Sequence, residues 1–217
     1  MCGQTLGHVS KGIKVQMSFC NLKCFLFNLH RIWDRFDGTK PGNYFTDRQL
    51  IKQAINTMNE ELAGCIRFSL KDKEYTGGKH VRVFRNWKQE ATANGCYATI
   101  GNAPVNSESH LYNQFDNKDF QIVSLGWPCV NEKTIIHEFV HTIGFFHEHA
   151  RPDRDAFITP NFNVITGMWV SQWQKRTQSL TFGVCYNPKS VMQYQAHKKN
   201  GEWEVQSKVC IKLITMK

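Results

Sequence analysis

Four of the chain's nine histidines fall within thirteen consecutive positions, in the stretch HEFVHTIGFFHEH. His137 and His141 are four residues apart, so on a helix both imidazoles lie on one face and can bind the same metal ion. Glu138 is placed beside them to take a proton from a metal-bound water. Gly144 allows a sharp bend that would bring His147 back as a third ligand. This spacing predicts a metal site that activates water.

The pattern is too specific to be an accident of composition. Three residues fixed at about 1 in 20 each arise by chance in roughly 1 chain in 40 of this length, so HExxH alone is a modest signal. Fixing Gly144 and His147 as well lowers the chance to roughly 1 in 10⁴. Only one of His147 and His149 is expected to bind, because a catalytic zinc ion keeps one coordination position open. The spacing of the metzincin motif, HExxHxxGxxH, selects His147.

Regular elements are predicted on both sides of this segment. Thr46 and Gln49 form a capping box, and apolar residues then recur at helical spacing up to Leu62, which predicts a helix over 46–62 that stops at Gly64. Short β-like runs follow between turn residues. They are CIRFSL (65–70), KHVRVFRN (79–86), GCYATIG (95–101) and DFQIVSLG (119–126).

The histidine segment itself is predicted to be a buried helix. Asn131 has the residue type of an N-cap, and the helix from about 132 to 143 is apolar on all sides. Gly144 favours the left-handed conformation that ends it. Beyond this point the composition becomes irregular, and we predict only one further helix, around 164–175.

Composition limits the classes of protein that remain. The formal charge is +9, but the 27 lysines and arginines are scattered along the chain, which indicates a solvated surface and no nucleic-acid partner. No stretch is long and apolar enough to span a membrane. Eight cysteines without any CxxC pair favour disulfides formed in an oxidising compartment over a zinc ribbon. We therefore expect a secreted protein, although the run 17–29 is too interrupted for a signal peptide.

The longer stretch HEFVHTIGFFHEHARPDRD resembles the extended signature of the astacin family of secreted zinc metalloendopeptidases, HExxHxxGFxHExxRxDRD, at every fixed position. The segments CIRF, GCYATIG, QIVSLG and SVMQY resemble other family segments in the family's order, so the resemblance runs from about residue 49 to 194. It implies an α+β domain of the zincin or metzincin type with two lobes. A twisted, mostly parallel sheet with two long helices would lie above the cleft, and a small irregular lower lobe below it.

The resemblance also implies roles for individual residues. One Zn²⁺ ion would be held by His137, His141 and His147, with Glu138 as base and then acid. SVMQY resembles the Met-turn, in which Met192 would form an apolar base under the metal. Tyr194 would stabilise the oxyanion. The family uses the residue at Glu148 to anchor the amino terminus that remains after a propeptide is removed.

Further implications concern disulfides and substrate. By resemblance Cys96 would pair with Cys129, and Cys65 with Cys210. The run QIVSLG would be the edge strand of the cleft, to which an extended substrate adds through main-chain hydrogen bonds. Gln193 stands where the family usually has histidine, and we expect this change to be tolerated because that side chain is not a ligand.

The domain organisation follows from where the resemblance begins. Residues 1–44 match poorly, and we interpret them as a propeptide remnant or an extension. Residues 45–217 form the catalytic domain, with an upper lobe of about 45–146 and a lower lobe of about 147–217. The start of the chain shows no convincing signal peptide, and the chain ends sooner after Tyr194 than family members usually do. We therefore expect it to be truncated at both ends.

The function predicted from these observations is that of a secreted zinc-dependent endopeptidase, which hydrolyses internal peptide bonds by attack of a zinc-bound water. Its partners would be protein or peptide substrates bound extended along the cleft. One alternative is a non-catalytic secreted binding protein that keeps the astacin fold, which the short carboxyl end favours. Another is a different metzincin peptidase, against which Glu148, RPDRD and Tyr194 argue. Zinc binding without hydrolysis would favour the binding protein.

Overall fold

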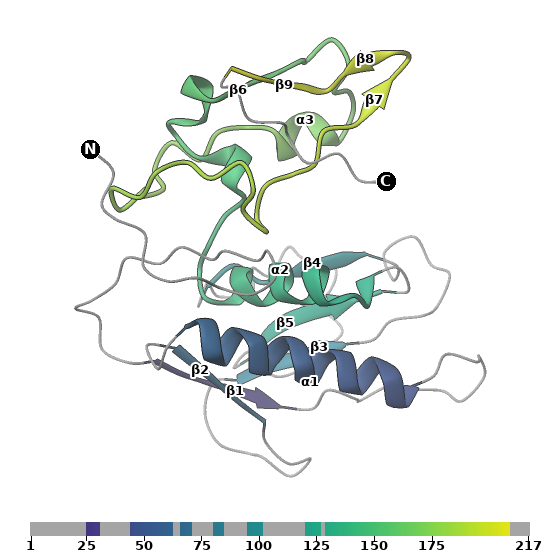
Figure 1. Ribbon diagram of the computed structural model, residues 1–217, viewed down its shortest axis with the longest axis vertical. Coiled ribbons are helices and arrows are strands. Elements are labelled where there is room, and N and C mark those ends of the chain that lie inside the picture. Colours follow the sequence, from purple (N-terminus) through teal and green to yellow (C-terminus); the bar gives the residue numbers. More distant parts are fainter. Residues whose placement is uncertain are drawn as a thin grey trace. The chain divides into compact units, whose positions relative to one another are not determined.

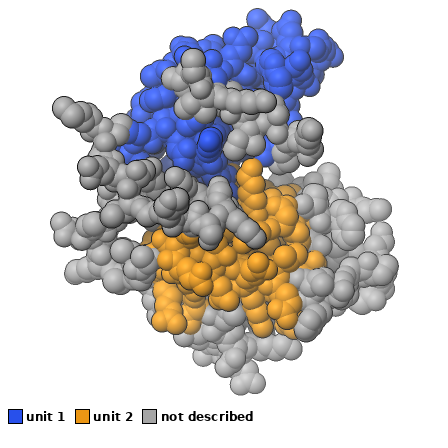
Figure 2. Space-filling model, in the orientation of Figure 1, with its two compact units in different colours: residues 1–18, 146–217 blue, residues 19–145 orange. Residues whose placement is uncertain are grey.

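The computed structural model describes residues 25–30, 44–62, 66–70, 80–84, 95–101, 120–126 and 129–208. These residues belong to two compact units, one before and one after the boundary between Phe145 and Phe146 (Figure 2). Among the described residues, no helix has the length and apolar character needed to cross a bilayer.

The first unit is built on a five-stranded sheet (Figure 1). Its order is β2-β1-β3-β5-β4, with β1 parallel to β2 and β3, β3 parallel to β5, and β4 antiparallel to β5. The strands are β1 (Phe25–His30), β2 (Ile66–Leu70), β3 (His80–Phe84), β4 (Cys96–Ala98) and β5 (Phe120–Leu125). The mostly parallel sheet that the resemblance implied is confirmed.

Two features of the sheet differ from the predictions. No strand was expected in the run FLFNLH, yet β1 occupies a position between β2 and β3. The alternation of Phe25, Phe27 and Leu29 with other residues was the signal for it. The run QIVSLG was expected at the edge, but β5 is covered by β4, which pairs Tyr97 with Ser124. A strand's own sequence does not say which neighbour adds to its far side.

Two helices lie side by side on this sheet, α1 (Tyr44–Glu61) and α2 (Glu132–Thr142) (Figure 1). α1 begins two residues before the predicted Thr46, because a capping pattern favours one start without preventing an earlier turn. Its buried stripe includes Ile51, Ile55 and Met58. Asn59 ties α1 to β2, since its amide bonds both the N–H of Phe68, at 2.7 Å, and its C=O, at 3.0 Å.

The second unit contains little regular structure. A short antiparallel pair, β6 (Ile158–Pro160) with β9 (Val205–Ser207), and a hairpin, β7 (Lys198–Lys199) with β8 (Glu202–Trp203), are its strands among the described residues. Two 3₁₀ turns, η3 (Glu148–Ala150) and η4 (Arg154–Ala156), precede them. Its core is the cluster of Ile158, Ile165, Trp173, Tyr186, Ala196 and Val205. The irregular character expected for this part is present.

The helix predicted over 164–175 is wrong in extent. Only α3 (Trp169–Gln172) is helical. The N–H groups of Val164 and Ile165 both bond the C=O of Asn161, at 3.0 and 2.9 Å, which closes a turn there. Gly167 follows with a φ of +63°. A residue in this left-handed conformation interrupts a right-handed helix.

Candidate functional site

The helix α2 presents the first part of the histidine segment from a buried and well-anchored position. Asn131 is its N-cap, and the side chain of Asn131 accepts a hydrogen bond from the N–H of Thr134 at 2.9 Å. The helix is buried over most of its surface, and the ring of Phe139 meets that of Phe68 edge-on at 5.3 Å. The predicted cap and the predicted burial of this helix are confirmed. Packing on both sides therefore holds the helix that carries His137, Glu138 and His141.

The carboxyl end of α2 is held by a close approach of two glycines. Gly144 has a φ of +106° and Gly101 a φ of +59°. Both donate their N–H to the C=O of His141, each at 2.9 Å. A Cβ on Gly101 would lie 3.3 Å from the Cα of Gly144, so the two backbones touch where side chains are absent. The side chain of Gln121 on β5 bonds the carbonyl oxygens of both Gly101 and Thr142.

Three histidines come together after this bend. His137, His141 and His147 each offer one ring nitrogen, and these atoms all lie within 4.8 Å of one another. They are the three that the spacing selected. Nδ1 of His141 bonds the C=O of Phe145 at 2.7 Å, and a carbonyl only accepts, so Nδ1 carries the proton and Nε2 is available as a ligand. A second partner of this kind fixes the orientation of a metal-binding ring.

The electrostatics of these side chains suit a bound cation. Burial, reinforced by His137, lowers the pKa of His141 to about 4, so the ring is neutral at neutral pH as a ligand must be. Burial raises the pKa of Glu138 to about 8. The residue is 3% exposed, and its Oε2 has no hydrogen-bond partner among the described residues. Three imidazole nitrogens within reach of one ion, together with a buried carboxyl whose Oε2 has no partner among the described residues, fit a catalytic zinc ion and a water.

Tyr194 lies against the third histidine. Its ring centroid is 4.3 Å from that of His147 and 4.1 Å from that of His149. Met192, two residues earlier, is buried, and its C=O accepts a hydrogen bond from the N–H of Glu148 at 2.9 Å. This bond ties the segment that follows His147 to the turn that carries Tyr194.

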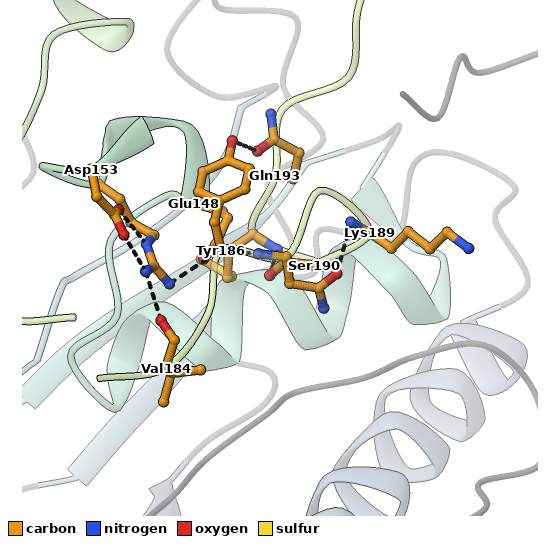
Figure 3. A network of polar contacts seen from close by, with 10 residues as sticks. Glu148, Asp153, Val184, Tyr186, Lys189, Ser190 and Gln193 are labelled. Atoms are coloured by element: carbon orange, nitrogen blue, oxygen red, sulfur yellow. Dashed lines mark hydrogen bonds and ion pairs between the residues drawn. The ribbon is translucent and has the colours of Figure 1, made fainter. Parts of the chain in front are cut away.

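A polar network around Glu148 also links the segment after His147 to the turn before Tyr194 (Figure 3). Oε1 of Glu148 accepts hydrogen bonds from the N–H of Asn187, at 2.7 Å, and from Nη1 of Arg151, at 3.3 Å. Arg151 also makes a two-pronged ion pair with Asp153, with N–O distances of 2.9 and 2.8 Å, and bonds the C=O of Val184. Burial raises the pKa of Glu148, and these donors oppose the shift. The network gives Arg151 and Asp153 of the signature a structural role that the sequence analysis did not assign.

His149 is a further residue whose role the sequence analysis missed. It is fully buried, its ring lies 4.5 Å from that of Trp173, and Nε2 donates to the C=O of Gln172 at 2.9 Å. Arg154, also buried, donates to the C=O of His149 at 2.9 Å. Nothing in the spacing of the histidines pointed to Trp173, because this contact joins residues 24 positions apart.

A disulfide joins the sheet to the segment that precedes α2. The structure contains a disulfide between Cys96 and Cys129, which are 33 positions apart. Cys185 is also disulfide-bonded. The expected pairing of Cys65 with Cys210 lies outside the described residues. The joined pair links β4 to the residues just before α2, and so stabilises the sheet edge next to the histidine helix.

A family model described as Astacin, a family of peptidases, matches residues 39–212. The chain belongs to the astacin family. This match excludes the other metzincin families that the sequence analysis kept open.

Known astacins share sequence and fold with this chain. It is 33% identical over 172 residues to the zinc metalloproteinase nas-5 of Caenorhabditis elegans, which covers 77% of this chain and 42% of the relative. It is 32% identical over 164 residues to nas-34 of the same organism, covering 71% of this chain and 24% of the relative. The chain therefore spans less than half the length of these two curated relatives. The solved high choriolytic enzyme 1 of Oryzias latipes, a hatching enzyme zinc-protease, matches 91% of this chain and 86% of its own with a TM-score of 0.61 at 20% identity, which shows the same fold.

Proposed function

We propose that this astacin is a secreted zinc-dependent endopeptidase that cleaves internal peptide bonds. The observation that carries the proposal is the group of three histidine ring nitrogens within 4.8 Å, two of them on the same helix as the buried Glu138. Relatives that are 32% and 33% identical are named zinc metalloproteinases, which supports the same activity here. His137, His141 and His147 would hold the ion.

Glu138 acts as the general base and then as the general acid. Zinc, when bound, supplies a Lewis acid that lowers the pKa of water and polarises a peptide carbonyl. The carboxylate of Glu138 takes a proton from the attacking water and gives it to the leaving amine. Without a metal, burial raises the pKa of Glu138 to about 8. A cation held by the three histidines would favour the ionised carboxylate, which is the form that can accept the proton.

Tyr194 steadies the negative charge that develops on the carbonyl oxygen. Its hydroxyl is a donor, and oxyanion stabilisation by one positioned donor contributes roughly 10²–10³-fold in kcat. The packing of its ring against His147 supports a place beside the metal ligands. Met192 would provide an apolar floor, in keeping with its burial.

Substrates are proteins or peptides in extended conformation. The strand β4 is the edge of the sheet, and an edge strand offers unpaired main-chain groups to which an extended peptide can add. Secretion is supported by the even number of cysteines and by the disulfide between Cys96 and Cys129.

The test is Glu138→Gln in the oxidised, zinc-loaded protein, with cleavage of an unstructured protein as the assay. Glu132→Gln is the matched control, because it makes the same change on the same helix and its Oε1 can still accept the 3.1 Å hydrogen bond from Thr57. We expect Glu138→Gln to keep one zinc ion and to lose at least about 10²–10⁴-fold in rate. Glu132→Gln should cleave like the wild type.

Two outcomes would contradict the proposal. If Glu138→Gln cleaves as fast as the wild type, Glu138 is not the base. If the folded, zinc-loaded wild type cleaves nothing, the chain is the non-catalytic binding protein that the sequence analysis kept as an alternative. Loss of cleavage on zinc chelation and its return on zinc addition would support the enzyme.

A further inference from the structure

We propose that Tyr186 and Gln193 are positioning residues for Tyr194. The amide of Gln193 bonds the hydroxyl of Tyr186 at one end and the backbone of Tyr194 at the other, which places the Tyr194 ring. This inference rests on the proposed role of Tyr194 in catalysis. It assigns a function to two side chains that are neither ligands of the metal nor the catalytic base.

Both the nitrogen and the oxygen of the Gln193 amide form hydrogen bonds. Nε2 donates to the C=O of Tyr194 at 2.9 Å. Because a carbonyl oxygen only accepts, this bond fixes the orientation of the amide, and Oε1 faces Tyr186. The hydroxyl of Tyr186 donates to that Oε1 (Figure 3). Gln193 is 9% exposed, so little water competes for either bond.

Tyr186 is a fixed reference point in the core of its unit. Its ring stacks on that of Phe157, with centroids 4.7 Å apart and planes 7° from parallel, and the guanidinium of Arg151 lies 5.6 Å from the ring centre. It belongs to the buried cluster against which Tyr194 also packs. Burial raises the pKa of Tyr186 well above its usual range, so the hydroxyl keeps the proton that it donates.

Hydrogen bonds of residues 187 to 193 stabilise the turn that precedes Tyr194. The N–H of Asn187 bonds Oε1 of Glu148, the N–H of Gln193 bonds the C=O of Ser190 at 3.0 Å, and the N–H of Met192 bonds Oγ of the same serine at 3.1 Å. These bonds fix the path of the turn up to residue 193. The link from Tyr186 through Gln193 extends that constraint to the backbone of Tyr194.

The constraint matters because the Tyr194 ring has close neighbours. Its ring centroid lies 4.3 Å from that of His147, so a small shift of its backbone changes where its hydroxyl points. A misplacement of about 1 Å can cost roughly 10²-fold in rate. Gln193 was expected to be a tolerated replacement for the family's usual histidine, because that side chain is not a ligand. The structure instead gives its side chain two hydrogen bonds.

The experiment compares Tyr186→Phe in two backgrounds, wild type and Tyr194→Phe, with the zinc-loaded full chain. Tyr186→Phe removes one hydroxyl and keeps the ring that stacks on Phe157. We expect kcat on a quenched fluorescent peptide to fall about tenfold, between no effect and the roughly 10²-fold of a 1 Å misplacement. KM should stay within about twofold and the zinc content at one. In the Tyr194→Phe background the same change should produce no further loss, because the residue it positions no longer has a hydroxyl.

A second variant, Gln193→Met, removes both hydrogen bonds at similar length. We expect it to lower kcat as Tyr186→Phe does, and the two changes together to cost no more than either alone. It also tests the proposal if Tyr186→Phe fails to fold. A full and independent loss of kcat in the Tyr194→Phe background would overturn the proposal, since the effect would then not pass through Tyr194.

A readout without catalysis separates this proposal from the proposed function. The ring signal of Tyr194 in a protein with ¹³C-labelled tyrosine can be assigned from its loss in Tyr194→Phe. Because the ring lies against two imidazoles, we expect this signal to shift in Tyr186→Phe even if the wild type cleaves nothing. An unchanged signal would overturn the positioning role. If Tyr194→Phe leaves kcat unchanged while the signal shifts, the catalytic role of Tyr194 fails and its placement by Tyr186 stands.

Discussion

Replacing Gly101 with alanine tests whether the contact between two backbones holds the end of the metal-binding helix. Gly101 lies 40 positions before the histidine that it bonds, and its N–H reaches the C=O of His141 at 2.9 Å. A Cβ there would lie 3.3 Å from the Cα of Gly144, and that neighbour is backbone that cannot rotate away. The helix end must therefore shift to admit the methyl group.

The expected loss of stability in Gly101→Ala is the sum of two separate costs. A left-handed φ of +59° penalises alanine by roughly 1–2 kcal/mol. Crowding against backbone adds about 1–3 kcal/mol, as for other overpacked sites. The total is about 2–5 kcal/mol in the free energy of unfolding. Because Gly101 supports the backbone of a metal ligand, we also expect a loss of about 10–100-fold in zinc affinity.

Gly167 supplies the matched control. It has a similar φ of +63°, but a Cβ there would meet no atom within 4 Å. Gly167→Ala should therefore cost only the backbone penalty of roughly 1–2 kcal/mol and leave zinc affinity unchanged. The assays are unfolding in guanidinium chloride and zinc competition with a chromogenic chelator. If Gly101→Ala matches Gly167→Ala in both, the close approach does not constrain His141 and the reasoning is refuted.

Three further predictions concern other parts of the chain. Replacing Cys96 and Cys129 together with alanine should cost about 4 kcal/mol, from the entropy of a loop of 33 residues in the unfolded chain, and the midpoint of denaturant unfolding measures it. Asp153→Asn should cost about 0.5–1 kcal/mol at pH 7, a small value because the carboxylate is 42% exposed. The hydrogen bond from Arg151 lowers the pKa of Asp153, so this stabilisation is complete above the ordinary pKa of about 3.9 and is lost as the pH falls through the lowered value. Melting curves of wild type and Asp153→Asn should thus converge in acid, and a constant gap would contradict the assignment. His149→Phe should keep one zinc ion per chain by metal analysis, because His149 is outside the three-histidine group, and a zinc-free variant would show that it is needed for the site.

Local sequence patterns were sufficient to predict the histidine helix and most of the strands. Asn131 could be identified as a cap because its side-chain oxygen accepts a hydrogen bond from a free N–H group only three residues later. His137 and His141 share a face because of helical periodicity alone. The strands β2 to β5 were visible because each is a short apolar run between turn residues. The order of the strands in the sheet could not be predicted in this way, since β4 occupies the edge position that was expected for β5.

The sequence by itself determined the chemistry: three histidines, a carboxylate and a glycine at offsets that a single helix and one bend convert into a zinc site. These are relations within eleven residues, and backbone geometry settles them locally. Only the tertiary structure decided what holds that site. The contact of Gly101 with Gly144, the burial of His149 against Trp173, and the link from Tyr186 through Gln193 to Tyr194 join side chains and backbone brought together by packing. No periodicity encodes such contacts, because they depend on which surfaces become buried against one another.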